Sequence, residues 1–251
     1  MSEETPRAEV FEGGPGAAEP PKEALRRRLA ARRLLRAESF YGFGLAAFAV
    51  LALLAYRHAY FGWDLRAARA VQSVDFPGWA EFMRAASYAG DGWVPHALVA
   101  ATMLLFFWRR RFSEGAGIVL SAGAGGLLSK ALKILVGRPR PSADLVGFSY
   151  LSDEMSFPSG HVTFYVCYFG FLFFVAYAVL PRGSLSRRLA LALAALPVLL
   201  VGLSRVYLRA HWPSDTLGAY LFAGLWLGLS LEMYRRWKKR ATIKKTVGSS
   251  Q

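Results

Sequence analysis

A short polar stretch interrupts the apolar sequence near its C-terminal end and contains Ser204, Arg205, His211 and Asp215. A helix that begins at Pro213 places Asp215 in its first turn, where the helix dipole favours a carboxylate. Asp215 is then close enough in sequence to accept a hydrogen bond from one nitrogen of His211, which leaves the other nitrogen as a nucleophile. Because charged groups are costly in a membrane, we interpret this stretch as a working site.

A second cluster carries groups that bind anions. Lys133 and Arg140 lie at the end of an apolar block, and Pro139 and Pro141 prevent a helix from continuing through this segment. The arginine side chain offers a fork of donors that matches phosphate oxygens, and lysine supplies a point charge. The segment therefore predicts an ordered loop that presents positive charge to an anion.

The third cluster is the run Pro158, Ser159, Gly160 and His161, just before another apolar block. Proline and serine are common at helix starts, which is an ordinary structural explanation. A helix N-terminus also presents free N–H groups to an anion, and glycine allows the anion to come close. His161 stands beside that position, and the unperturbed pKa of histidine, about 6.5, allows it to donate a proton near neutral pH.

Two histidines and an aspartate could instead ligate a metal ion. Such an ion would share its pocket with the positive charges of Lys133, Arg140 and Arg205. An anion suits that pocket better, so we expect neither a metal nor another cofactor.

Together the three clusters resemble the signature of the type-2 phosphatidic acid phosphatase (PAP2) superfamily, which reads K-x6-RP, PSGH and SR-x5-H-x3-D in that order. The resemblance covers about residues 93–235 and points to the membrane-integral lipid phosphatase branch. Only Lys133 and Arg140 give the required gap in the first motif, so Arg138 falls outside the signature.

The resemblance implies a covalent phosphohistidine mechanism. His211 would attack phosphorus, Asp215 would orient it, and His161 would protonate the departing lipid oxygen and later activate water. The groups that it implies for phosphate binding are Lys133, Arg140, Ser159, Gly160 and Arg205.

The substrate that the resemblance implies is a lipid phosphate or diphosphate. Undecaprenyl diphosphate, phosphatidylglycerol phosphate, phosphatidic acid and lipid A all fit, with undecaprenyl diphosphate or a glycerophospholipid phosphate favoured. Two alternatives remain open, namely a lipid-to-lipid phosphotransferase that uses the same site and a lipid-phosphate binder or transporter without turnover. The related haloperoxidases, which hold vanadate in a similar pocket, fit less well.

The elements that must position these residues are membrane helices. The chain has 251 residues, of which 54% are hydrophobic and 19% charged. A spanning helix needs about 20 mostly apolar residues, and six blocks approach that length. We therefore expect an all-α bundle of six spans at about 40–56, 93–108, 115–136, 162–180, 187–207 and 216–234.

The chain has a net charge of +14, and the positions of its basic residues between the apolar blocks predict the orientation of the bundle. Arginines and lysines follow the second and sixth blocks and lie between the fourth and fifth, so both termini are expected in the cytoplasm. The three clusters then share the opposite face, which we expect to be the periplasmic face of a bacterial inner membrane. Topology and lipid headgroups account for the charge, and no nucleic acid is expected. The sequence leaves the oligomeric state open.

Composition divides the chain further. We expect a disordered leader over 1–22, a basic amphipathic helix on the membrane surface over 23–38, the membrane domain over 39–236 and a basic cytoplasmic tail over 237–251. The aromatic residues of the first extracytoplasmic connection predict interfacial helices there. Small residues at Gly123, Gly125 and Gly126 predict close helix packing, and the single cysteine, Cys167, excludes an intramolecular disulfide.

Overall fold

The computed structural model describes residues 22–147 and 155–248, and the regular structure in these residues is helical. The chain divides into two units, residues 1–42 and 43–251, and every residue of the three clusters belongs to the second. Most of the predicted leader and residues 249–251 of the predicted tail lie outside the described residues. The proposed roles of the leader, surface helix and tail stay predictions.

Within residues 22–147 and 155–248, five segments are long and apolar enough to cross a membrane. The first is the apolar part of α1 (Lys22–Arg57), and the second is the continuous run of α5 (Phe112–Ile118), η2 (Val119–Ala124) and α6 (Gly125–Val136). The other three are α8 (Gly160–Val179), α9 (Leu185–Tyr207) and the apolar part of α10 (Pro213–Gly248). The all-α multi-pass fold expected from the sequence is confirmed.

The second predicted span, at about 93–108, differs from the other five because it is broken. α4 (Val94–Trp108) has only 15 residues, which is short for a bilayer crossing. It passes as a span only together with α3 (Trp79–Ser87) and η1 (Tyr88–Gly90), from which it is bent by 54°. The connection between α1 and α4 contains two helices, α2 (Gly62–Gln72) and α3, where the sequence predicted interfacial helices. Of these, α3 is also one half of the broken span.

The exterior of the second unit is apolar, as expected for a surface that faces lipid. Leu127 is 72% exposed and Leu199 is 73% exposed, whereas the charged side chains of Asp64, Glu114 and Arg138 are buried. This distribution is the reverse of that in a water-soluble protein. Polar groups buried in this way need partners inside the bundle.

Small residues bring the helices close together, but not at every predicted position. A Cβ atom built on Gly125 would lie 3.0 Å from the sulfur of Cys167, which confirms a packing role for this glycine. A Cβ atom on Gly126 would meet nothing within 4 Å, so the same prediction is wrong there. Gly117 in α5 is still tighter, since an added Cβ would overlap the ring of Phe171, which is completely buried in α8.

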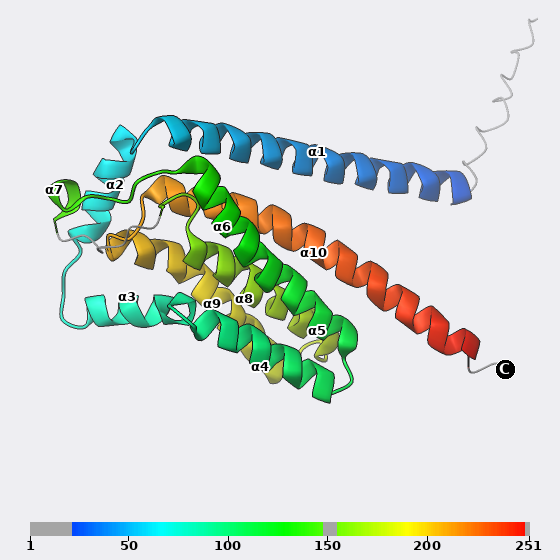
Figure 1. Ribbon diagram of the computed structural model, residues 1–251. Helices are drawn as coiled ribbons and strands as arrows, with labels where there is room; N and C mark the ends of the chain where they lie inside the picture. The colour runs from blue at the N-terminus through cyan, green and yellow to red at the C-terminus, as the bar shows by residue number, and fades with distance from the viewer. Residues whose placement is uncertain (1–21, 148–154, 249–251) are drawn as a thin grey trace, which may run out of the picture. The chain divides into compact units, whose positions relative to one another are not determined.

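The helix ends that carry the three clusters meet at one end of the bundle (Figure 1). α6 and α9 end there, α8 and α10 begin there, and α2, α3 and α7 (Ala143–Val146) lie around the same end. α8 packs against α9, α10 and α6, so it is the central helix of this group. The topology thus delivers residues that are up to 82 positions apart in sequence, Lys133 and Asp215, to one place.

Gly117→Ala is expected to destabilise the protein by about 1–3 kcal/mol, because the new methyl group must displace the buried Phe171 ring. Gly126→Ala is the matched control, since it adds the same methyl group to a helix where there is space. The measurement is thermal unfolding in detergent. Equal melting temperatures for the two variants would contradict the packing described for Gly117.

Candidate active site

His211 and Asp215 lie together in the short turn before α10 and in its first turn, and both are buried. α10 begins at Pro213, so Asp215 has the predicted place. The His211 Nδ1 and Asp215 Oδ2 atoms are 3.6 Å apart, which is longer than a hydrogen bond. Ser156 connects them, because its hydroxyl donates to Asp215 Oδ2 and lies 3.4 Å from His211 Nδ1. Contacts of this kind often shorten when a substrate binds.

The carboxylate of Asp215 is fixed at both of its oxygens. Oδ2 accepts a hydrogen bond from the backbone N–H of Trp212 at 2.8 Å, and Oδ1 accepts one from Arg138 Nη1 at 2.6 Å. The indole ring of Trp212 is itself buried and stacks on Tyr60 with 5.2 Å between the ring centroids. The turn that carries His211 is therefore anchored by packing and by hydrogen bonds.

Three cations from three different segments face His211. Lys133 Nζ donates to the carbonyl of Met155, Arg140 Nη1 donates to the carbonyl of Ala210 at 3.2 Å, and Arg205 Nη1 donates to the hydroxyl of Ser87 at 3.3 Å. The structure thus brings together the basic residues that the sequence placed in one pocket.

The surroundings of His211 keep its imidazole neutral. Burial disfavours the charged ring, and the positive charges of Lys133, Arg140 and Arg205 add to this effect, so the pKa of His211 lies well below its usual value. A neutral imidazole has a free lone pair on the nitrogen that does not face Asp215. That nitrogen, Nε2, is the group suited to nucleophilic attack.

His161 lies in the first turn of α8 and has a carboxylate partner that sequence reasoning missed. Its Nε2 atom is 2.7 Å from Oδ1 of Asp91, which lies between η1 and α4 at the break of the bent span. Arg205 Nη1 is 3.9 Å from the same oxygen. The only signal in the sequence is one acidic residue between two glycines just before an apolar block, which is too common a pattern to indicate a site.

The start of α8 is built to receive an anion. Ser159 occupies the N-cap position and is buried, and its Oγ atom has no hydrogen-bond partner within the part of the chain that the structure describes. The first N–H groups of a helix have no acceptor within the helix. A Cβ atom on Gly160 would lie 3.7 Å from Cε of Lys133, so this glycine lies beside one of the cations. A phosphate oxygen is the type of group that fits these donors.

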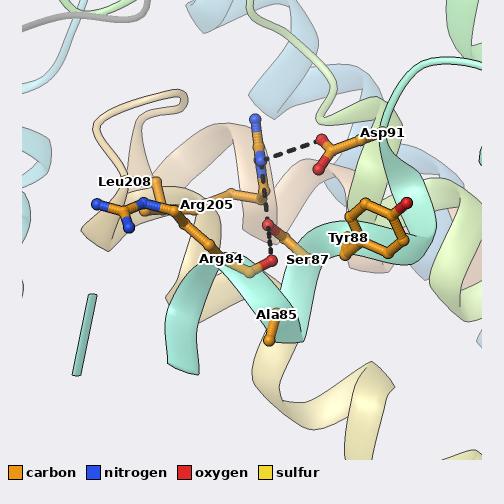
Figure 2. A pocket seen from close by; sticks show the side chains of 7 residues that line it. All are labelled: Arg84, Ala85, Ser87, Tyr88, Asp91, Arg205 and Leu208. Atoms are coloured by element: carbon orange, nitrogen blue, oxygen red, sulfur yellow. Dashed lines mark hydrogen bonds and ion pairs between the residues drawn. The ribbon is translucent and has the colours of Figure 1, made fainter. Parts of the chain in front are cut away.

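A cavity of about 470 Å³ adjoins the site. Figure 2 shows the Arg205 guanidinium in its wall between the Asp91 carboxylate and the Ser87 hydroxyl, with Arg84 and Tyr88 nearby. The wall that these residues and Leu208 form is partly charged and partly apolar. The cavity can therefore take a polar head group that is attached to a hydrophobic chain.

Sequence reasoning also missed Ser156, Asp64 and Arg138. Ser156 is two residues before the PSGH run and Asp64 lies in α2, so neither belongs to a recognised motif. Arg138 was left outside the signature because of its spacing, yet its guanidinium contacts Asp215 directly. The role of Arg209 could not be predicted from the sequence. Its side chain lies against Gly147 at the end of α7, and its backbone is left-handed with φ of 60°.

Searches for related proteins give consistent matches. The chain is 35% identical over 117 residues to phosphatidylglycerophosphatase B of Bacillus subtilis, a match that covers 46% of this chain and 55% of that protein. It is 33% identical over 156 residues to decaprenylphosphoryl-5-phosphoribose phosphatase of Mycobacterium tuberculosis, with 58% of this chain and 76% of that protein covered. The chain thus spans only about half of the length of the first of these relatives.

Among solved structures, the transmembrane PAP2-type phosphatidylglycerolphosphate phosphatase from Bacillus subtilis is similar, with a TM-score of 0.66 and 27% sequence identity. The similarity covers 78% of this chain and 96% of that one. The family model of the PAP2 superfamily matches residues 114–239, which is half of the chain and includes the three clusters. The chain belongs to the PAP2 superfamily.

Proposed function

We propose that this protein removes a phosphate group, or the terminal phosphate of a diphosphate, from a membrane lipid through a phosphohistidine intermediate. The observation that carries the proposal is the position of His211, a buried neutral imidazole with Asp215 on one side and the charges of Lys133, Arg140 and Arg205 around it. This arrangement combines a nucleophile with a pocket for the group that it attacks.

In the first step, the lone pair of His211 Nε2 forms a bond to phosphorus while the bond from phosphorus to the lipid oxygen breaks. His161 donates its proton to that oxygen, so the lipid leaves as an alcohol or, from a diphosphate, as a monophosphate. Asp215 and Ser156 hold the Nδ1 side of His211, which fixes the tautomer with Nε2 unprotonated.

In the second step, water attacks the phosphohistidine. His161, now neutral, accepts the proton of the water, the bond between phosphorus and Nε2 breaks, and inorganic phosphate leaves. Asp91 accepts a hydrogen bond from His161 Nε2 when that nitrogen is protonated, and so favours the charged form of the ring, which the first step uses and the second step forms again.

The charge of the transferring group is balanced by the protein itself. Lys133, Arg140 and Arg205 supply positive charge, and the Ser159 hydroxyl and the Gly160 N–H supply hydrogen bonds to the phosphoryl oxygens. A metal cation would be repelled by the same three side chains. The proposed reaction therefore uses no metal ion.

The proposed substrate is undecaprenyl diphosphate or a glycerophospholipid phosphate. The cavity beside Arg205 has room for a head group, and the apolar exterior of the helices gives a lipid chain access from the bilayer. The Bacillus subtilis relative is named for phosphatidylglycerophosphate and the Mycobacterium tuberculosis relative for a decaprenyl-linked sugar phosphate, so glycerophospholipids and polyprenyl lipids both occur among the substrates for which similar proteins are named. The distribution of basic residues supports a site on the periplasmic face of a bacterial inner membrane, with both termini cytoplasmic.

The assignment is tested by phosphate release from single purified lipids: undecaprenyl diphosphate, phosphatidylglycerol phosphate, phosphatidic acid and lipid A. We expect the wild-type protein to release inorganic phosphate from at least one lipid in the presence of EDTA. His211→Ala should lower that rate about a thousandfold or more, because the nucleophile is lost.

Three results would contradict this assignment. Full activity of His211→Ala would remove the nucleophile from the mechanism. Transfer of phosphate to a second lipid with no release to water would identify a phosphotransferase, and binding without turnover would identify a binding protein.

The protonation state of His211 gives a second prediction. Because burial and three cations lower the pKa of His211, its ring should stay neutral well below pH 6.5 in the free protein. The measurement is an NMR titration of isotope-labelled histidine in detergent, with His211→Ala used to assign the signal among the four histidines. A signal of His211 that titrates at or above pH 6.5 would be inconsistent with the described electrostatics.

The role of His161 as an acid is tested with a leaving group that needs no proton. His161→Ala should lose about 100-fold or more in the release of a lipid alcohol, which is a typical contribution of general acid catalysis. With p-nitrophenyl phosphate the same variant should still form the phosphoenzyme, seen as a burst of p-nitrophenolate that is followed by slow turnover. If His161→Ala slows the first step equally for the lipid and for p-nitrophenyl phosphate, His161 does not protonate the leaving group.

A further inference from the structure

The guanidinium of Arg138 is enclosed between two carboxylates. Nη1 lies 2.6 Å from Asp215 Oδ1, Nη2 lies 2.9 Å from Asp64 Oδ2, and all three side chains are fully buried. Nε donates to the carbonyl groups of His58 at 3.3 Å and Ala59 at 3.1 Å. Arginine keeps its charge in such surroundings, so this is a permanent cation within the protein interior.

Asp64 holds the same assembly from the other side. It comes from α2, yet its Oδ1 accepts the backbone N–H of Ser214 at 2.8 Å and its Oδ2 accepts the hydroxyl of Ser214 at 2.7 Å. That hydroxyl also accepts a hydrogen bond from Arg138 Nη1 at 2.7 Å. Asp64 therefore caps the first turn of α10, the turn that carries Asp215.

The charges of this cluster do not cancel. Two carboxylates share one guanidinium, which leaves one negative charge beside the Nδ1 atom of His211. Lys133, Arg140 and Arg205 place positive charge around the same ring. The excess negative charge is therefore available to stabilise His211 when its Nε2 atom bonds to phosphorus and the ring becomes cationic.

The two oxygens of Asp215 have separate partners. Oδ1 is bound by Arg138, whereas Oδ2 accepts from Ser156 and the Trp212 N–H and is the oxygen near His211. Binding of Oδ1 fixes the rotation of the carboxylate, so that Oδ2 is presented to the imidazole. A lysine at position 138 could not do the same, because a single ammonium group lacks the planar fork that reaches both carboxylates.

We propose that Arg138 is a positioning residue for catalysis, which keeps Asp215 ionised and aimed at His211, and that Asp64 holds Arg138 and the start of α10 in the geometry this requires. The inference rests on the proposed phosphohistidine mechanism. It separates the two arginines of the GRPRP run, since Arg140 faces the phosphate pocket and Arg138 acts only through the carboxylate.

The test is a double-mutant cycle with Arg138→Gln, Asp215→Asn and the double variant, assayed by phosphate release from the best lipid of the panel. Each single variant should lower kcat about 100-fold. The double variant should be within about threefold of Asp215→Asn alone, because residues that act as one unit are not additive. KM should change little, since Arg138 does not contact the phosphate.

The pH dependence gives a readout that a purely structural role would not move. The charged and titratable side chains around Asp215 include Arg138, His211 and, across the shared guanidinium, Asp64, and Ser156 and the Trp212 N–H are its neutral partners. Without the guanidinium, the buried carboxylate takes up a proton more readily. The acidic limb of the kcat profile should therefore move to higher pH in Arg138→Gln, and Arg138→Lys, which keeps the charge, should show a smaller movement.

Three results would overturn the inference. The first is a loss of kcat in the double variant that equals the product of the two single losses. The second is a kcat of Arg138→Gln that falls only in proportion to the amount of folded protein, with no shift of the acidic limb of its pH profile. The third is a wild-type rate in Arg138→Gln. Should Arg138→Gln fail to fold, Arg138→Lys and Asp64→Asn carry the same two readouts, with losses of about tenfold expected. Failure of the proposed function itself is distinguishable, because the wild-type protein would then release no phosphate to water, or His211→Ala would keep the wild-type rate.

Discussion

One buried imidazole between two opposite groups of charge is the constraint on which the rest of this structure depends. Lys133, Arg140 and Arg205 make the pocket beside His211 positive, whereas the carboxylates of Asp64 and Asp215, held by Arg138, leave one excess negative charge. Neither group is tolerable in hydrocarbon by itself. The members of each group come from different segments, which the packing of the bundle holds in place. In the acidic group, all four carboxylate oxygens of Asp64 and Asp215 have hydrogen-bond partners.

Residues of the first connection, between α1 and α4, form part of the site. α2 supplies Asp64, the last residue of α3 supplies the Ser87 hydroxyl, and the break before α4 supplies Asp91. A straight span through residues 79–108 would carry its backbone past the site, whereas the 54° bend places an irregular segment beside Arg205 and His161. Non-helical backbone at membrane depth is tolerated where it lines a polar site. The broken span is therefore best understood as part of the site.

The sequence allowed prediction of those features whose signal is local. Apolar block lengths located the spans, and fixed spacings located the residues from Lys133 to Asp215 that meet at one end of the bundle. Asp64, Asp91 and Ser156 were not predictable in this way, because their importance comes from partners that are 55 to 150 residues distant. Arg138 was passed over for another reason. The spacing rule selects the arginine of the phosphate pocket and gives no information about a neighbour that serves the carboxylate.

The site contains two pairs of a histidine and a carboxylate, His211 with Asp215 and His161 with Asp91, and the surroundings of the two pairs suit the different roles that we propose for them. Asp215 is fully buried and its geometry is fixed by Arg138, which suits a partner that must hold one tautomer of a nucleophile throughout the reaction. Asp91 is 47% exposed and adjoins the open cavity, which suits a partner of a group that first gives a proton to the leaving lipid and then takes one from water. In many active sites, two side chains of the same type have different acid or base roles because their surroundings differ. Here the difference follows from topology, since Asp215 lies in the first turn of α10, which packs against the central helix α8, whereas Asp91 lies at the break of the bent span.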